Sequence, residues 1–307
     1  MLSCAWLALS LICAGSIVPG IALTGLREQK PLEQTSVNAA EPSVILPEAV
    51  PKSTASTTQA PSRHEIPYSA AGEEHSPKRS NAPGFHEAPN GQGKYVALTF
   101  DDGPSGKVTK NILDLLEKYD AKATFFALGN RAQGYQALLQ RMTAMGCEVA
   151  SHSFAHKHLV KLSTAQLVKD LTKASDALEK ASGQRPVLLR PPYGERNVCI
   201  ESNAKMPLIL WSIDTKDWYY RDKEKDTRSA AQRQKDLERV ANEVLDTVRN
   251  GDIVLMHDLY DMTEQAAAVI LKELTEKGWN LVTVSELFRI HGITLENGKI
   301  YRSARGV

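Results

Sequence analysis

The chain has 307 residues, a formal net charge of +1 at pH 7 and 42% hydrophobic residues. This length suits one large domain with additional segments, or two domains. The near-neutral charge gives no support for a nucleic-acid partner, which a strongly basic chain would indicate. Of the four cysteines, only Cys147 and Cys199 lie in the part expected to be globular. We interpret them as free thiols, although a disulfide stays open because the sequence does not give their separation.

Residues 1–26 are apolar and carry no charged side chain. The segment is long enough to span a bilayer but lacks the basic start of a well-formed signal peptide. Two interpretations stay open, a cleaved export signal and an uncleaved membrane anchor, and we favour the anchor. A lipidated Cys13 is disfavoured because the bulky Ile12 precedes it. We therefore expect an exported protein at the cell surface or in the cell wall.

Residues 27–93 form a predicted linker that contains nine of the fifteen prolines and many Ser, Thr and Ala residues. Tyr68 and Phe85 are its aromatic residues. Such a segment cannot bury enough apolar surface to offset the entropy cost of ordering it. We expect a disordered tether that holds a domain away from a membrane.

Residues 94–289 alternate apolar runs with amphipathic helical patterns. The seven predicted strands are 94–100, 123–128, 147–151, 187–190, 207–213, 252–256 and 280–284. Ser163 and Gln166 form a predicted capping box before one of the helices. Repeated strand–helix units favour parallel strands with crossover helices. We expect an α/β fold, first as a distorted seven-unit (β/α) barrel and second as an open doubly wound sheet, followed by a polar tail at 290–307.

Clusters of polar residues follow five of the predicted strands. Because active sites in parallel α/β folds gather at the carboxyl ends of the strands, these clusters are expected to meet. Adjacent carboxylates such as Asp101 and Asp102 repel unless a cation or a proton separates their roles. Together with His152 and His156, they suggest an Asp-His-His metal site with an acid–base carboxylate beside it. The clusters hold Asp101 and Asp102; His152 and His156; Arg190, Pro191 and Tyr193; Asp214, Asp217 and Trp218; and His257.

These clusters resemble the five motifs of the polysaccharide deacetylases, carbohydrate esterase family four. The motifs read TFDDGP at 99–104, HSFAH at 152–156, RPPYG at 190–194, DTKDW at 214–218 and LMH at 255–257. The resemblance covers residues 94–289 and implies a distorted seven-unit barrel. All five motifs are intact, which favours a working enzyme.

The resemblance also implies roles for individual residues. Asp102, His152 and His156 would bind one divalent ion, for which we favour Zn²⁺ over Co²⁺, Ni²⁺ or Mn²⁺. Asp101 would be the general base, and Arg190 would orient it.

The remaining motif residues would serve the acyl group and the leaving amine. The backbone N–H of Tyr193 would stabilise the oxyanion, and His257 would protonate the departing amine. Asp217, or alternatively Asp214, would pair with His257. Pro191, Trp218 and Leu255 would line the acetyl pocket.

The predicted reaction is removal of N-acetyl groups from a polysaccharide, most plausibly N-acetylglucosamine in peptidoglycan. Chitin oligomers and acetylated xylan are the alternative substrates, and a wall-binding module of the same fold is the non-enzymatic alternative. The expected partner is a glycan, the expected state a monomer, and a membrane is involved only through residues 1–26. We interpret His158 as a solvated turn residue rather than a fourth ligand. The charged run at 221–228 either caps the edge of the groove or forms a solvated loop.

Overall fold

The computed structural model describes residues 93–220 and 228–305. The predicted anchor or export signal, nearly all of the predicted linker and most of the charged run at 221–228 lie outside these residues. Within them, no helix is both long enough and apolar enough to cross a membrane.

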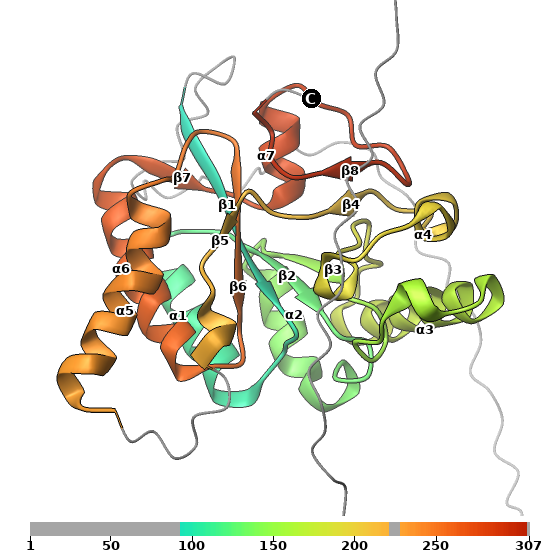
Figure 1. The fold of residues 1–307 in the computed structure, drawn as a ribbon, viewed down its shortest axis with the longest axis horizontal. Helices are drawn as coiled ribbons and strands as arrows, with labels where there is room; N and C mark the ends of the chain where they lie inside the picture. Colours follow the sequence, from blue (N-terminus) through green and yellow to red (C-terminus); the bar gives the residue numbers. More distant parts are fainter. Residues whose placement is uncertain (1–92, 221–227, 306–307) are drawn as a thin grey trace, which may run out of the picture. The chain divides into compact units, whose positions relative to one another are not determined.

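A mostly parallel sheet built around one long buried strand forms the centre of the domain (Figure 1). This strand, β1 (Lys94–Asp101), pairs in parallel with β2 and β6 and, through its first residues, with β7. β3 extends the sheet beyond β2, and β5 extends it beyond β6. The bounds are β2 Thr124–Ala127, β3 Glu148–Ser151, β5 Ile213–Asp214, β6 Asp252–His257 and β7 Trp279–Leu281.

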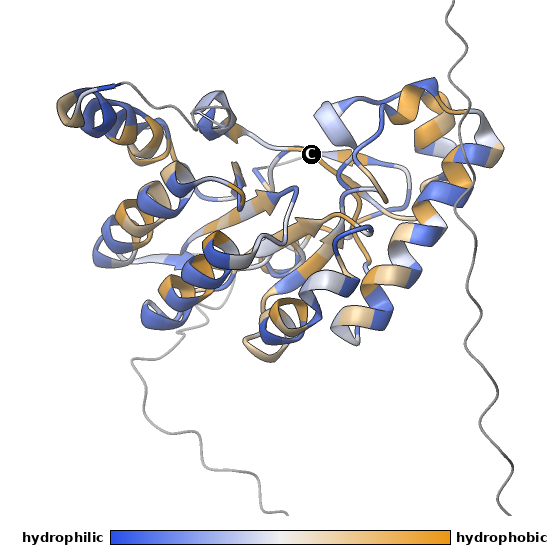
Figure 2. Cartoon of the chain, turned by 90° about the horizontal axis from the view of Figure 1, so that it is seen from below, coloured by the Kyte–Doolittle hydropathy of each residue, from blue (hydrophilic) through white to orange (hydrophobic). Residues whose placement is uncertain are grey.

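Seven α-helices of the described part cover the sheet, and their apolar sides face it (Figure 2). In α1, Val108, Ile112 and Leu116 lie on the buried face, as their helical spacing predicts. The capping box at the start of α3 is confirmed, because Ser163 and Gln166 each accept the backbone N–H of the other. The helices are α1 Gly106–Lys118, α2 Gln136–Ala144, α3 Thr164–Ser182, α4 Val198–Asn203, α5 Ala230–Leu245, α6 Asp261–Glu276 and α7 Val284–Ile290.

The strand predicted at 207–213 is wrong as a single element, because this segment changes neighbours midway. Its first part, β4 (Leu208–Ile209), lies between Leu189 and a short C-terminal strand, whereas the N–H of Ser212 donates to Ile253 of β6. Leu189 also bridges Ser151 of the edge strand β3, so Leu189 and this segment together link β3 to β6 at the other side of the sheet. This closure favours the distorted barrel over the open sheet.

The strand predicted at 187–190 is also wrong, because only Leu189 pairs there, through isolated bridges to Ser151 and Leu208. A run of four apolar residues does not show how many of them find a partner strand. The α/β class and the mainly parallel pairing are confirmed.

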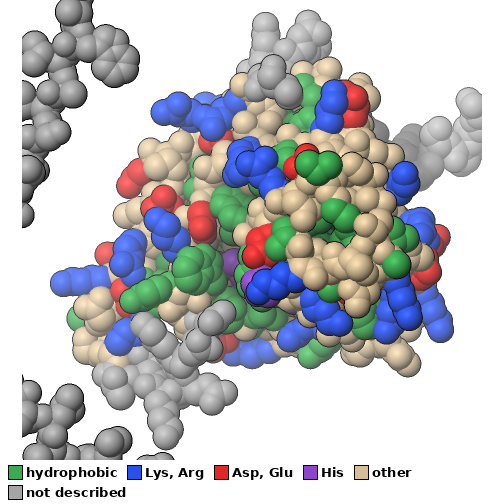
Figure 3. Space-filling model, turned by 45° about the vertical axis from the view of Figure 1, so that its right-hand side comes forward, with side chains coloured by type: hydrophobic (Ala, Val, Ile, Leu, Met, Phe, Trp, Pro, Cys, Tyr) green, Lys and Arg blue, Asp and Glu red, His purple; other side chains and the backbone are tan. Residues whose placement is uncertain are grey.

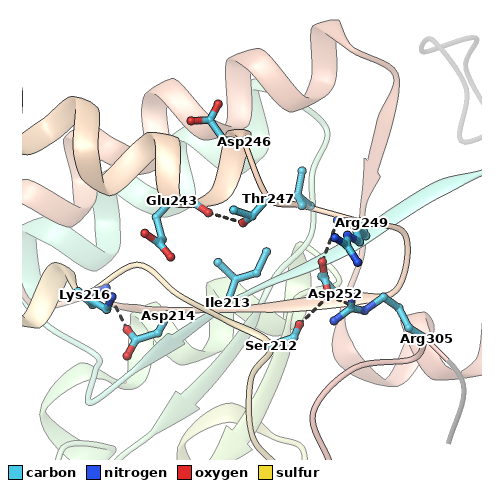
Figure 4. A pocket seen from close by; sticks show the side chains of 11 residues that line it. Ser212, Ile213, Asp214, Lys216, Glu243, Asp246, Thr247, Arg249, Asp252 and Arg305 are labelled. Carbon is cyan, nitrogen blue, oxygen red and sulfur yellow. Dashed lines mark hydrogen bonds and ion pairs between the residues drawn. The ribbon is translucent and has the colours of Figure 1, made fainter.

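Residues 290–305 belong to the packed domain and do not form the expected polar tail. β8 (Ile300–Tyr301) pairs with β4, and the buried Tyr301 ring contacts Phe288 with 5.2 Å between ring centroids. Arg305 forms a 2.9 Å ion pair with the buried Asp252 of β6. These two residues help to line a cavity of about 580 Å³ (Figure 4). The carboxylate of Asp252 in this cavity is also bonded to Ser212 and to the N–H of Arg249, which makes it a structural anchor.

Both cysteines of the described part are free thiols, as predicted. Cys147 is buried, and burial raises the pKa of its thiol to about 11, so the thiol stays protonated.

Candidate active site

The polar clusters meet at the carboxyl end of the parallel strands, as the sequence predicts. Asp101 at the end of β1 lies opposite His257 at the end of β6, in direct register. Figure 3 shows histidine side chains in a recess of this face, with hydrophobic and basic side chains beside them. Residues far apart in the sequence thus share one site because their strands are neighbours.

Asp102, His152 and His156 form a compact group of potential metal ligands. Asp102 Oδ1 lies 3.4 Å from His152 Nε2 and 3.2 Å from His156 Nε2. The ligand atoms of the three residues all lie within 4.8 Å of one another, which no other group of His, Cys, Asp and Glu in residues 93–220 and 228–305 achieves. The spacing suits a shared cation.

The chemistry of this group also fits a cation. Asp102 Oδ1 is buried and has no hydrogen-bond partner within the described residues. The Nδ1–H of His152 donates to the carbonyl of Arg190 at 2.7 Å, which leaves the Nε2 lone pair directed at Asp102. Burial opposes ionisation of Asp102, but His152, His156 and His257 outweigh it and hold the pKa of its carboxyl at about 2. The carboxylate is therefore ionised at neutral pH and available as a ligand.

The backbone of two ligands is left-handed, with φ of 73° at Asp102 and 54° at His156. Few residues other than glycine adopt this region. At the next position, Gly103, any Cβ would overlap the carboxylate of Asp258, so only glycine fits. The loop after β1 is thus shaped by close contact with the end of β6.

Asp101 forms a buried ion pair with Arg190. The two side chains are 4% and 0% exposed, and Arg190 Nη1 lies 2.6 Å from Asp101 Oδ1. Arg190 also donates to Thr99 Oγ1 and to the carbonyls of Ile209 and Leu210, where the split strand bends. Charge pairing and four hydrogen bonds from the guanidinium allow both groups to be buried. Asp101 is therefore rigidly oriented beside the candidate ligands.

His257 pairs with Asp217 and not with Asp214. Its Nδ1–H donates to Asp217 Oδ1 at 2.8 Å, and its backbone N–H donates to Oδ2 at 2.7 Å. Asp214 instead accepts the N–H of Lys216. Burial of His257 disfavours its protonation, but Asp217, with Asp101 and Asp102, outweighs burial and raises the pKa of the imidazole to about 9. The imidazole of His257 is therefore protonated at neutral pH.

The residues expected to hold the acyl group lie next to these pairs. Leu255 precedes His257 by two positions on β6 and is buried, as is Pro191 after Arg190. Trp218 is 42% exposed, and its backbone N–H donates to Asp217 Oδ1. Tyr193 has φ of 61° and is 55% exposed. The pocket and oxyanion roles stay predictions.

Three residues of this region have contacts that the sequence did not predict. His158 stands outside the group of potential ligands, as predicted, and its side chain is 42% exposed but also pairs with Glu195. Asp258 is buried and accepts Thr109 Oγ1–H at 2.5 Å. Asp258 directly follows His257 at a strand end, and this position could have identified it from the sequence as a site residue. No local sequence pattern identifies Glu195.

A parallel α/β barrel with a candidate metal site at its strand ends is the class of protein that these features define. Residues 88–207 match the polysaccharide deacetylase family model. The chain is 42% identical over 194 residues to the peptidoglycan-N-acetylmuramic acid deacetylase PdaC of Bacillus subtilis, a match covering 63% of this chain and 38% of PdaC. It is 36% identical over 211 residues to a peptidoglycan-N-acetylglucosamine deacetylase of Bacillus cereus, a match covering 66% of this chain and 92% of the B. cereus protein.

Among solved structures, a family 4 acetyl xylan esterase from Clostridium thermocellum, in complex with a cobalt ion, superposes with a TM-score of 0.62. Its identity to this chain is 30%, and the match covers 69% of this chain and all of the esterase chain. The chain therefore belongs to the polysaccharide deacetylase family, and the distorted (β/α) barrel is confirmed. The chain spans about two fifths of the length of PdaC.

Proposed function

We propose that the protein is a metal-dependent deacetylase that removes N-acetyl groups from peptidoglycan, with N-acetylglucosamine as the favoured sugar. The observation that carries the proposal is the convergence of three groups at one strand edge. They are the potential ligands around Asp102, the Asp101–Arg190 pair and the Asp217–His257 pair. The names of the relatives support peptidoglycan as the substrate, and one relative supports N-acetylmuramic acid as the sugar to test beside it.

Asp102, His152 and His156 would hold one divalent ion, and two imidazoles with a carboxylate suit Zn²⁺, Co²⁺, Ni²⁺ or Mn²⁺. We propose Zn²⁺, while the cobalt complex of the C. thermocellum esterase supports Co²⁺ as an alternative. When bound, such an ion lowers the pKa of water and polarises the acyl carbonyl.

Asp101 accepts the proton of the attacking water as general base. Arg190 holds this carboxylate in one orientation through the 2.6 Å contact. The N–H of Tyr193 donates to the carbonyl oxygen as negative charge develops on it. Pro191, Trp218 and Leu255 surround the acetyl methyl group.

His257 donates a proton to the departing sugar amine. Because Asp217 holds its Nδ1–H, the other ring nitrogen is the one that faces the substrate. The product amine becomes cationic at neutral pH, so the reaction changes the charge of the glycan.

The direct test is acetate release from purified peptidoglycan, chitin oligomers and acetylated xylan, with and without a chelator. Wild-type protein should release acetate from peptidoglycan, and the chelator should abolish this release. Asp101→Asn should lose turnover by at least about 100-fold and keep its metal, since a positioned base contributes 10²–10⁴-fold. Asp214→Asn, a nearby acid bonded only to its own turn in the described residues, is the matched control.

Loss of metal in Asp101→Asn would mean that the roles of the two acids are exchanged. No acetate from any glycan, with metal supplied, would contradict deacetylation. Co-sedimentation of the inactive protein with peptidoglycan would then favour a wall-binding module.

We also propose that residues 1–26 deliver the protein to the cell surface, that residues 27–93 act as a tether, and that the enzyme is a monomer. Fractionation of cells and light scattering of the purified protein test these points.

A further inference from the structure

His158 and Glu195 connect the two loops that carry the candidate ligands and Tyr193. His158 Nδ1 lies 2.9 Å from Glu195 Oε1, so the imidazole N–H donates to the carboxylate. Glu195 Oε2 is buried and has no hydrogen-bond partner among the described residues. The carboxylate is therefore held in place chiefly by His158.

The ring of Tyr193 contacts two imidazoles. His158 stacks on it with 4.2 Å between centroids and 13° between planes. His156, a candidate ligand, meets it edge-on with 4.5 Å between centroids, and the Tyr193 hydroxyl donates to the carbonyl of His156 at 3.5 Å. Aromatic pairs favour these two geometries. The ring is thus fixed against the loop after β3.

The backbone of Tyr193 needs this support. Its φ of 61° and ψ of 6° lie in the left-handed region, which bulky residues other than glycine rarely adopt. Such a conformation persists only when the surrounding structure over-determines it. The direction of the Tyr193 N–H depends on φ of Tyr193 and ψ of Pro192, because these two angles set the orientation of the peptide plane that carries it.

We infer that His158 and Glu195 are positioning residues that hold the Tyr193 ring against His156 and so aim the Tyr193 N–H at the oxyanion. The inference rests on the proposed function only for the oxyanion role. Neither residue contacts the reacting atoms, and the effect passes through the conformation of Tyr193.

The kinetic test compares His158→Ala, His158→Phe and Glu195→Gln. His158→Ala removes both the stack and the hydrogen bond, and we expect kcat to fall about 10- to 100-fold with KM nearly unchanged, since a misplaced oxyanion donor acts in the transition state. His158→Phe retains the stack but loses the hydrogen bond to Glu195, so its kcat should lie between those of His158→Ala and wild type. Glu195→Gln retains an acceptor for His158 and should keep kcat within about threefold of wild type. Lys157→Ala, an exposed neighbour, is the matched control.

A wild-type kcat in His158→Ala would overturn the inference. So would a fall in kcat that is equally large in His158→Phe and His158→Ala. Loss of bound metal in His158→Ala would also overturn it, because His158 would then support the ligand His156.

A second readout does not depend on activity. Crystal structures of wild type and His158→Ala should show Tyr193 at positive φ in the former and displaced in the latter. If wild-type protein releases no acetate, the proposed function fails, and these structures still decide the positioning claim. Tyr193 unmoved in His158→Ala would refute it.

Discussion

At the residue scale, Asp102 shows why a candidate metal ligand destabilises the folded protein when no cation is bound. Its Oδ1 is buried without a hydrogen-bond donor among the described residues, and its backbone has φ of 73°. A buried carboxylate oxygen without a hydrogen-bond donor destabilises the folded state, and a left-handed backbone adds a second free-energy cost. Two imidazole nitrogens within 3.4 Å make a shared cation the natural compensation.

The pairing of His257 with Asp217 predicts the alkaline limb of the pH profile. The proposed reaction needs protonated His257, and its pKa of about 9 keeps the proton available up to that pH. The kcat should therefore fall as pH rises through about 9. In Asp217→Asn the main charge that raises this pKa is removed, so the fall should move toward the ordinary value of 6.5.

The measurement is kcat for acetate release between about pH 6 and 10, with thermal unfolding of each variant as a check on folding. Asp214→Asn should keep the wild-type profile. An alkaline limb at the same pH in Asp217→Asn and in wild type would refute the assignment of His257 as the proton donor.

Asp258 predicts a different pH effect, on stability. Burial, with Asp101 and Asp102 nearby, raises the pKa of its carboxyl from 3.8 to about 7, against a hydrogen bond from Thr109. The folded state then binds the proton more tightly than the unfolded state, so this group lowers stability as pH rises from about 4 to about 7. The side chain in Asp258→Asn cannot ionise, so the free energy of unfolding of this variant should decrease less steeply with rising pH in this range.

Urea unfolding at several pH values between 4 and 8 measures this slope. Asp261→Asn, whose carboxylate is exposed, is the control. Parallel slopes for Asp258→Asn and wild type would show that the buried carboxyl does not titrate in this range.

Sequence reasoning placed the motif residues at the strand ends but could not choose between similar neighbours. Asp214 ends β5 and Asp217 lies three residues further on, and only the three-dimensional arrangement shows that Asp217 reaches His257. The His158–Glu195 pair joins residues 37 positions apart, which no local pattern indicates.

At the element scale, four strands of the central sheet were predicted well, whereas the segments with split or brief pairing were not. β1, β2, β3 and β6 lie within about a residue or two of their expected bounds because each contains adjacent buried apolar residues. The segment at 207–213 and the two residues of β8 were misjudged, because their structure depends on which neighbours they meet.

The packing of β8 predicts that Tyr301 stabilises the barrel, although it lies in the segment expected to be a tail. Its ring is 5% exposed and contacts Phe288. Tyr301→Ala should lower the free energy of unfolding by about 3–5 kcal/mol, as for other large aromatic truncations in a core. Arg302→Ala, at an exposed neighbour, should change it by less than about 0.5 kcal/mol. Chemical denaturation measures both variants. A Tyr301→Ala protein as stable as wild type would mean that β8 contributes nothing to the core.

At the scale of the whole molecule, barrel closure assembles the site. Arg190 follows the bridge at Leu189 and bonds to Asp101 on β1 and to the bend between β4 and β5, while its carbonyl orients His152. The buried Arg190 thus connects the candidate base, a candidate ligand and the segment that closes the barrel. Breaking such a buried pair by removing one partner is strongly destabilising, so the site and the fold depend on the same contacts.

The most direct test of the account is the metal content of the purified protein after removal of metal by dialysis and titration with Zn²⁺. Wild type, Asp101→Asn and the control Asp214→Asn should each bind one equivalent. Asp102→Asn and His156→Ala should each weaken binding by at least about tenfold, since each removes a direct ligand. Wild-type protein that binds no divalent ion, or ligand variants that bind it as tightly as wild type, would contradict the account.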